Sequence, residues 1–318
     1  METIIQSLLF IFFLAIVIKS ADYFTEAAEK IGLHFKISPF IIGVTIIALG
    51  TSLPEVATSV SSVLKNESSM VINNVVGSNM ANILFVLAIT AIVGRGIKVD
   101  RDIIKNDLPI LLASTILIFL TTLDGVFTIP DAIISLIILL TYTIYNAKSH
   151  RQIDPQEKRD QSKLKKETKK LGFKQPLIMI TSGVALYFSA SFTIDSVITI
   201  ANIFNISTGI IAVSAVAIGT SLPELAVSII AIKKGKADIA IGNITGSNIF
   251  NILGVMGIPA LIGPLEIPQE VITFHIPALL LVTILYIFIT IDKEISQWEG
   301  ITLLMLFVAY LGKTFGLI

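Results

Sequence analysis

Long apolar segments alternate with short polar ones along almost the whole chain of 318 residues. A helix needs roughly 20 apolar residues to cross a lipid bilayer, and ten segments meet this requirement. The predicted spans cover residues 3–23, 39–63, 70–94, 106–122, 127–147, 175–199, 208–232, 239–263, 270–291 and 299–316. The pattern therefore predicts an all-α polytopic membrane protein of ten transmembrane helices.

The composition agrees with a lipid environment. Hydrophobic residues make up 54% of the chain and charged residues 14%, whereas soluble domains are about a quarter charged. The formal net charge is zero, so the lipid bilayer is the expected partner and no nucleic acid is. There are no cysteines, which excludes disulfides, thiolate metal sites and cysteine nucleophiles.

Most of the 23 Lys and Arg residues lie in every second predicted loop. Cytoplasmic loops are enriched in these residues. We therefore expect a multi-pass protein of the cell membrane, with the N- and C-termini outside and the central loop in the cytoplasm. That loop, residues 148–174, is basic. We interpret it as a solvated linker, with a lipid-binding or regulatory role as the alternative.

A self-match joins the two halves of the chain. Residues 38–84 contain SPFIIGVTIIALGTSLPEVATS and then NNVVGSNMANIL, and residues 207–253 contain STGIIAVSAVAIGTSLPELAVS and then GNITGSNIFNIL. Matching positions are 169 residues apart throughout, without a gap. We therefore divide the chain into a first five-helix repeat, 1–147, the linker 148–174, and a second five-helix repeat, 175–318.

Each half has an odd number of spans, so the second repeat must enter the membrane from the side opposite to the first. Inverted repeats with a binding site near the bilayer midplane, built on discontinuous helices, are typical of secondary transporters. A channel or a membrane enzyme has less reason to be built in this way.

The first repeated motif, GTSLPE, occupies residues 50–55 and 219–224, within predicted spans 2 and 7. Ser52 and Glu55 have the spacing of a capping box, and Pro54 is tolerated in the first turn of a helix. The preceding helix must end or kink there, because proline lacks an amide donor. We therefore expect broken helices in spans 2 and 7, whose freed carbonyls need partners such as a cation.

Glu55 and Glu224 are the carboxylates of this motif. They could cap their helices and do no more, but an ionised carboxylate near the bilayer centre is costly and is functional by default. Two of them facing each other repel at low dielectric, and a divalent cation neutralises the pair. Calcium takes carboxylate, carbonyl and hydroxyl oxygens. The motif supplies all three kinds and lacks the soft or nitrogen ligands that favour zinc or copper.

The second motif, GSNxxN, occupies residues 77–82 and 246–251. Its Ser and its last Asn are four residues apart and therefore share a helix face. Its glycine permits close helix approach or a bend, so broken helices are expected in spans 3 and 8 as well. We interpret the oxygen-rich Ser and Asn pairs as ion ligands, with hydrogen bonding between helices as the alternative.

These paired motifs resemble the alpha-repeats of the cation/calcium exchanger superfamily, and most closely its prokaryotic sodium/calcium exchanger branch. The resemblance extends over nearly the whole chain. It implies a fold in which spans 2, 3, 7 and 8 surround the ion sites while spans 1 and 6 slide as a gating pair. It further implies that calcium and sodium are the transported ions and that no cofactor is needed.

The resemblance also implies a set of metal-binding residues. Glu55 and Glu224 would be the main calcium ligands and would share in sodium binding. The remaining implied ligands are Thr51 and Thr220, through carbonyls and hydroxyls; Ser52, Ser221, Ala48 and Ala217, which complete the sodium sites, the alanines through their carbonyls; and Ser78, Ser247, Asn82 and Asn251, which line the same sites.

The chain departs from some branches of this superfamily. Asn251 stands where some relatives, including potassium-dependent ones, have an acidic residue, and its counterpart in the first half is Asn82. We therefore expect no dependence on potassium. The proton-coupled branch has a Glu after a Gly-Asn pair in its repeat, and that pattern is absent.

The function we expect is secondary active antiport of sodium and calcium by alternating access, and not an enzymatic reaction. The resemblance implies three sodium ions per calcium ion, which would make exchange electrogenic. The alternatives are a calcium/proton exchanger on the same fold and, from a different class, a calcium channel. We expect the protein to work as a monomer, and we interpret Asp124 and Asp195, at the outer ends of spans, as interface residues.

Overall fold

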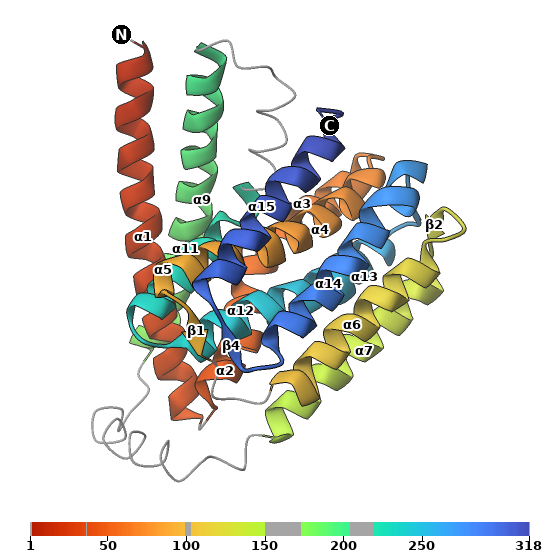
Figure 1. Ribbon diagram of the computed structural model, residues 1–318, viewed down its shortest axis with the longest axis horizontal. Coiled ribbons are helices and arrows are strands. Elements are labelled where there is room, and N and C mark those ends of the chain that lie inside the picture. Colours follow the sequence, from red (N-terminus) through yellow and green to blue (C-terminus); the bar gives the residue numbers. More distant parts are fainter. Residues whose placement is uncertain (1, 36, 99–102, 150–172, 204–218, 318) are drawn as a thin grey trace.

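The computed structural model describes residues 2–35, 37–98, 103–149, 173–203 and 219–317. These ranges are almost entirely helical (Figure 1). The first half contains α1 (Glu2–His34), α2 (Pro39–Ile41), η1 (Ile42–Ile47), α3 (Ala48–Leu64), α4 (Ser69–Ala81), η2 (Asn82–Val86), α5 (Leu87–Gly94), β1 (Ile97–Lys98), α6 (Ile103–Thr121), β2 (Val126–Phe127) and α7 (Ile129–Ser149). The second half contains α9 (Lys174–Ile203), α11 (Leu222–Lys233), α12 (Ala237–Phe250), η3 (Asn251–Val255), α13 (Met256–Ala260), β3 (Leu265–Glu266), η4 (Val271–His275), α14 (Ile276–Thr290), β4 (Glu294–Ile295) and α15 (Gln297–Thr314). The elements labelled η are π-helices.

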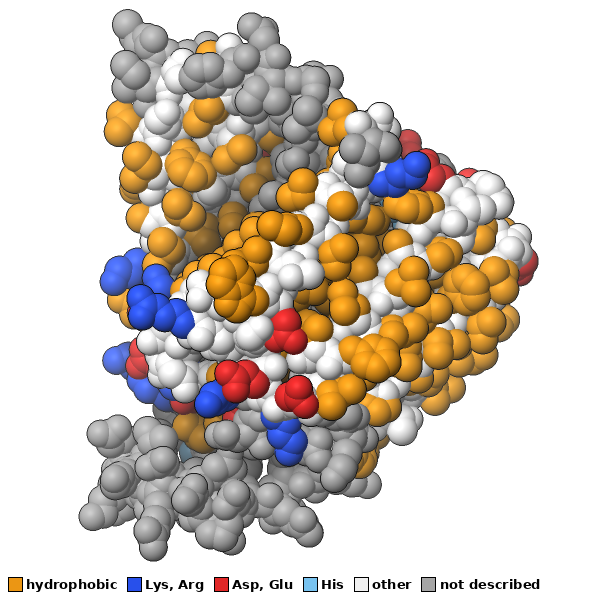
Figure 2. Space-filling view, viewed as in Figure 1, with side chains coloured by type: hydrophobic (Ala, Val, Ile, Leu, Met, Phe, Trp, Pro, Cys, Tyr) orange, Lys and Arg blue, Asp and Glu red, His pale blue; other side chains and the backbone are white. Residues whose placement is uncertain are grey.

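Seven helical stretches of the described part are long and apolar enough to cross a membrane. They are Ile5–His34, Pro39–Leu64, Ser69–Gly94, Ile129–Asn146, Lys174–Ile200, Ala237–Ala260 and Val271–Thr290. Figure 2 shows hydrophobic side chains over most of one face, with charged side chains gathered mainly in its lower left part and at its right-hand edge. An all-α polytopic fold is therefore confirmed. The number of ten spans stays a prediction, since residues 204–218 of span 7 lie outside the described part.

Helices α1 and α9 form a pair at one edge of the molecule. Figure 1 shows them side by side and antiparallel, so that the start of α1 and the end of α9 lie at the same end. Between them, Phe24 and Leu186 belong to a hydrophobic cluster that is separate from the main core. The other helices form a second body, whose core lies along α4, α5, α12, η3 and α14.

Helix α12 passes through the centre of that second body, and every residue from 239 to 250 is buried. Two glycines allow it to lie directly against the backbone of span 2. A Cβ atom on Gly242 would be 2.3 Å from the carbonyl oxygen of Phe40, and one on Gly246 would be 2.4 Å from that of Val44. Small residues are used in this way where two membrane helices approach closely.

The expected breaks in spans 3 and 8 take the form of π-helical segments, whereas the π-helical segment of span 2, η1, ends at Ile47, before the motif at residues 50–55 where the break was expected. Segments η2 and η3 begin at Asn82 and Asn251, which are matching positions of the repeat. A π-helical turn contains one more residue than an α-helical turn and is frequent at functional sites. The chain therefore stays helical where it was expected to unwind.

The expected helix start at Ser52 is wrong. Helix α3 begins at Ala48 and continues through Pro54, and no side-chain cap forms at its start. Membrane helices tolerate an internal proline because neighbouring helices and local adjustments satisfy the backbone groups that it frees. In the second repeat the expected start is confirmed, because α11 begins at Leu222 with Ser221 as its N-cap residue, although the Ser221 side chain makes no capping hydrogen bond.

Two short antiparallel ribbons join the halves. Strand β1 pairs with β4, with Ile97 opposite Ile295, and β2 pairs with β3, with Val126 opposite Glu266. With the offset of 169 residues, the repeat counterpart of Ile97 is Glu266 and that of Ile295 is Val126. The two paired positions of the first ribbon therefore correspond to the two paired positions of the second. This is the relation that a twofold axis between the two halves would produce, and Figure 1 shows β1 and β2 at different ends of the molecule.

Replacing Gly246 with alanine should lower the free energy of unfolding by about 1–3 kcal/mol, as overpacking typically does. The new methyl group would meet the Val44 backbone, which cannot move aside as a side chain can. Thermal unfolding in detergent measures the effect. The matched control is Gly263→Ala, whose Cβ would meet only the Val63 side chain at 3.8 Å. Equal unfolding temperatures for the two variants would contradict the close backbone contact.

Candidate cation site

Glu55 of α3 and Glu224 of α11 lie in the interior of the protein. Their exposed fractions are 2% and 1%, and the helices that carry them, α3 and α11, contact each other. Among the described residues, Oε2 of Glu55 and both carboxylate oxygens of Glu224 have no hydrogen-bond partner. Burying a carboxylate without a partner is strongly unfavourable. A positive charge between the two would remove this cost.

Hydroxyl groups bring the first motif of each half against the second motif of the other. Thr51 Oγ1 lies 3.5 Å from Ser247 Oγ, and Ser78 Oγ lies 3.1 Å from Thr220 Oγ1. Thr51 matches Thr220 in the repeat, and Ser78 matches Ser247. The two contacts are therefore equivalent under exchange of the halves, and they bring four of the expected ligands together in two pairs.

More buried acceptors are left without a partner around these contacts. Native proteins satisfy nearly all buried polar atoms, so a group of exceptions calls for a ligand. Within the described ranges the unpartnered oxygens include Oγ of Ser52, Ser59 and Ser221, and Oδ1 of Asn82, Asn248 and Asn251. Most belong to the two repeated motifs. They are oxygen acceptors, which suits a hard cation such as calcium or sodium.

The remaining expected ligands are the two alanines. The Ala48 carbonyl accepts a hydrogen bond from Thr51 Oγ1 at 3.2 Å, so it lies beside the motif hydroxyls. Ala217 lies outside the described residues. No group of three or more His, Asp and Glu side chains that could hold a metal ion occurs in the described part of the chain. The site there combines two carboxylates with neutral oxygens.

The structure adds three asparagines that the sequence interpretation missed as site residues: Asn79, Asn248 and Asn243. Asn251 Nδ2 donates to Asn79 Oδ1 at 3.2 Å, and Asn79 Nδ2 donates to the Asn248 carbonyl at 3.3 Å. These bonds use the amide nitrogen of Asn251 and leave its Oδ1 available. Asn79 and Asn248 occupy the same place in the two GSNxxN motifs, and that repetition was the available signal.

The third of these asparagines, Asn243, links α3 and α11, the helices that carry Glu55 and Glu224. Its Nδ2 donates to the Glu224 carbonyl at 3.3 Å and to Ser228 Oγ at 3.1 Å. Its Oδ1 accepts from Thr51 Oγ1 at 3.4 Å. Asn243 therefore fixes the backbone of α11 beside the Thr51 hydroxyl. Its repeat counterpart is Asn74, which was the signal in the sequence.

A cavity of about 300 Å³ reaches this group from one side. Glu55 and Thr220 line it together with residues of α9, among them Ser191 and Asp195. Asp195, which was interpreted as an interface residue at the outer end of its span, is exposed and also lines this cavity. The cavity therefore lies between the buried carboxylate of Glu55 and the face of α9 that carries Asp195.

The family comparisons agree with this geometry. The family model described as sodium/calcium exchanger protein matches residues 5–148 and 174–315. This chain belongs to the sodium/calcium exchanger family. The match confirms the resemblance seen in the duplicated motifs, and it places the chain in a family of transporters rather than in a class of enzymes.

The exchanger is similar to curated relatives over nearly its whole length. It is 34% identical to the inner membrane protein YrbG of Escherichia coli over 297 residues, covering 92% of this chain and 90% of YrbG. It is 29% identical to the sodium/calcium exchanger MaX1 of Methanosarcina acetivorans over 333 residues, covering 94% of this chain and 95% of MaX1. It is also similar to the solved structure of the sodium-calcium exchanger NCX_Mj soaked with zero Na⁺ and Ca²⁺, with a TM-score of 0.80, 28% identity, and coverage of 98% of this chain and 99% of that one.

Calcium should stabilise the exchanger against heat in detergent, by about 2.7 kcal/mol at a concentration 100 times its dissociation constant. Glu55→Gln and Glu224→Gln should respond much less, because each removes half of the negative charge. In a calcium chelator both variants should be at least as stable as the wild-type protein, since the repulsion between the carboxylates is gone. Unfolding temperature with calcium or chelator measures this.

The matched control is Glu266→Gln, which removes an exposed carboxylate in β3. This variant should keep the full calcium response. A Glu224→Gln protein that calcium stabilises as strongly as the wild-type protein would contradict the assignment of the site.

Proposed function

We propose that this exchanger is a secondary active antiporter that moves sodium in one direction and calcium in the other by alternating access. Glu55 and Glu224 are the main calcium ligands in this proposal. The observation that carries it is the pair of buried carboxylates without hydrogen-bond partners, surrounded by unpartnered hydroxyl and amide oxygens. The name of the relative MaX1, a sodium/calcium exchanger, supports the same pair of ions.

Charge balance favours a divalent cation between the two carboxylates. Two ionised carboxylates and one calcium ion give local neutrality, and calcium takes six to eight oxygen ligands. Sodium ions bind the same carboxylates together with the hydroxyl pairs Thr51–Ser247 and Ser78–Thr220. Because the two ligand sets share Glu55 and Glu224, calcium and sodium exclude each other. Mutual exclusion is what couples the two fluxes.

Three sodium ions per calcium ion are the proposed stoichiometry. This ratio moves one net positive charge in each cycle, so exchange is electrogenic. Uptake of calcium against sodium efflux then carries positive charge outwards. The proposal includes ligation by the motif residues Thr51, Thr220, Ser52, Ser221, Ala48, Ala217, Ser78, Ser247, Asn82 and Asn251, and it needs no cofactor.

Independence from potassium is proposed from the neutral side chains at Asn82 and Asn251. A third carboxylate at either position would add a negative charge that another monovalent cation could balance. Here Asn251 is held by the hydrogen bond that its Nδ2 donates to Asn79 Oδ1, and it offers only a neutral oxygen.

The cellular placement that goes with this function is a cell membrane with both termini outside and residues 148–174 in the cytoplasm. The repeats 1–147 and 175–318 then cross the membrane in opposite directions, and one chain suffices for transport. The distribution of Lys and Arg supports this orientation.

A calcium/proton exchanger on the same fold is the second candidate. Glu224 has two buried oxygens without a partner, and a buried carboxylate of this kind binds protons readily. A calcium channel is less well supported, because a duplicated site on inverted repeats is the arrangement of carriers.

Proteoliposomes loaded with sodium and diluted into sodium-free buffer should take up radioactive calcium. The wild-type protein should need internal sodium, and Glu55→Gln and Glu224→Gln should lose nearly all uptake because the remaining carboxylate cannot neutralise calcium. Glu266→Gln should behave as the wild-type protein. Uptake that ignores sodium but follows a pH gradient would favour the proton exchanger, and uptake with no counter-ion would favour a channel.

An inside-positive membrane potential should accelerate this uptake and an inside-negative one should slow it, because each cycle exports one positive charge. Replacing all potassium with choline should change nothing while the potential is held constant. Flux that is insensitive to the potential would contradict three-to-one exchange. A loss of uptake without potassium would contradict the role given to Asn251.

A further inference from the structure

One wall of the cavity beside Glu55 carries an aspartate that the transport site does not use. Ser191, Asp195 and Ile198 lie on one face of α9 and line this cavity. Asp195 is exposed, whereas Glu55 in the same cavity is buried and has an unpartnered oxygen. A cation moving from the surface to Glu55 through this cavity therefore passes Asp195.

The repeat gives Asp195 a counterpart in the other half. With the offset of 169 residues, the repeat counterpart of Asp195 is Glu26 of α1. Both residues are acidic. The same offset pairs Ser20 with Ser189, and all of these residues lie on the two edge helices. Ser20 and Ser189 are both buried, so the correspondence holds in burial as well as in sequence.

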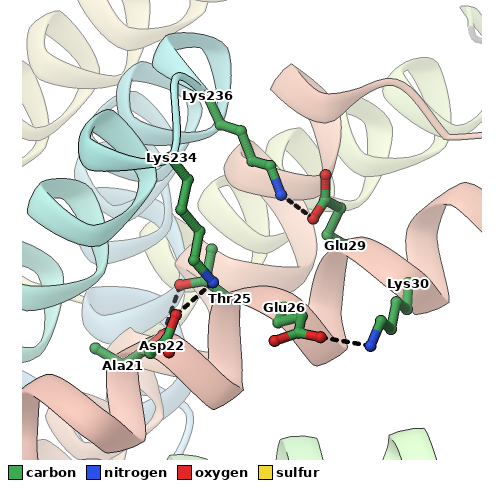
Figure 3. Close-up of polar contacts among 8 residues, drawn as sticks. All are labelled: Ala21, Asp22, Thr25, Glu26, Glu29, Lys30, Lys234 and Lys236. Atoms are coloured by element: carbon green, nitrogen blue, oxygen red, sulfur yellow. Dashed lines mark hydrogen bonds and ion pairs between the residues drawn. The ribbon is translucent and has the colours of Figure 1, made fainter. Parts of the chain in front are cut away.

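The surroundings of Glu26 differ from those of Asp195. Figure 3 shows Lys30 bonded to Glu26, at 2.5 Å, and the neighbouring acids of α1 paired with the turn between α11 and α12. Lys234 is paired with Asp22, and Lys236 with Glu29. These ion pairs hold the C-terminal part of α1 against the second body of the protein. That part of α1 lies at the end of the molecule opposite to the C-terminal part of α9 (Figure 1).

We propose that Asp195 and Glu26 are entrance carboxylates, one for each of two access routes to the same site. Asp195 concentrates cations at the route that is open in this structure. Glu26 does the same on the opposite side of the membrane, once Lys234 and Lys236 have separated from Asp22 and Glu29. This inference rests on the proposed alternating-access function and adds to it the residues that capture ions on each side.

The physical basis is the field of a fixed negative charge at the mouth of a narrow cavity. Such a charge raises the local concentration of cations and speeds their association. The interaction energy is proportional to the charge of the ion. The enrichment factor for calcium is therefore the square of the factor for sodium, which distinguishes an electrostatic entrance from a merely structural residue.

The test is self-exchange of radioactive calcium in right-side-out and inverted membrane vesicles, which needs no sodium. With Asp195→Asn the half-saturating calcium concentration on the side predicted to be outside should rise about fourfold. The sodium concentration that inhibits exchange from that side should rise about twofold. The maximal rate should stay the same, and Asp195→Glu should restore both values. Both shifts should shrink at high ionic strength because salt screens the charge.

Glu26→Gln should produce the same changes on the opposite side only. The control is Glu67→Gln, which removes an exposed charge in the turn between α3 and α4, away from the cavity, and it should shift neither value. Equal shifts for sodium and calcium, equal shifts on both sides, or no shift with either variant would overturn the proposal. Wild-type self-exchange without any response to sodium would instead overturn sodium coupling, and the entrance carboxylates would still be tested by the calcium values.

Discussion

The burial of two like charges is the constraint on which the rest of this structure depends. Glu55 and Glu224 are almost wholly buried, and each has at least one oxygen without a hydrogen-bond partner among the described residues. A cation bound between the two carboxylates lowers the free energy of the protein because it balances their charge, and loss of the cation raises that free energy again. A carrier needs this property, because the site must bind strongly enough to select an ion and must not be stable when it is empty.

Close packing of α12 is what assembles the oxygens around these charges. Gly242 and Gly246 let this helix contact the backbone of span 2, and this contact sets the positions of Asn243 and Ser247 beside Thr51. A bulkier helix would stand farther away and would separate the two motifs. The arrangement of the oxygens in the candidate site therefore depends on glycines that carry no ligand atoms in their side chains.

Much of the site could be predicted from the sequence because duplication marks it. Glu55 and Glu224 stand out as charges within apolar segments, and the repeat identifies the Ser and Asn residues beside them. The continuous helix through Pro54 could not be predicted, because the rule that proline ends a helix is local and the compensating contacts come from other helices. Asn243 was missed, and Asp195 was not connected with the cavity beside Glu55, for a related reason. Their roles depend on which helices lie next to each other, and hydrophobic periodicity does not report this.

The contacts at the centre of the protein also set an order of events during its synthesis. Thr51 and Ser78 contact Ser247 and Thr220, which follow them in the chain by 196 and 142 residues. The first half is made and inserted before these partners exist, since synthesis proceeds from the N-terminus. Until the second half is inserted, Glu55 and the hydroxyl groups of Thr51 and Ser78 lie in the bilayer without these partners. The candidate ion site therefore cannot assemble before α12 is in place, and a chain that stops before α12 leaves Thr51 without its contact to Ser247.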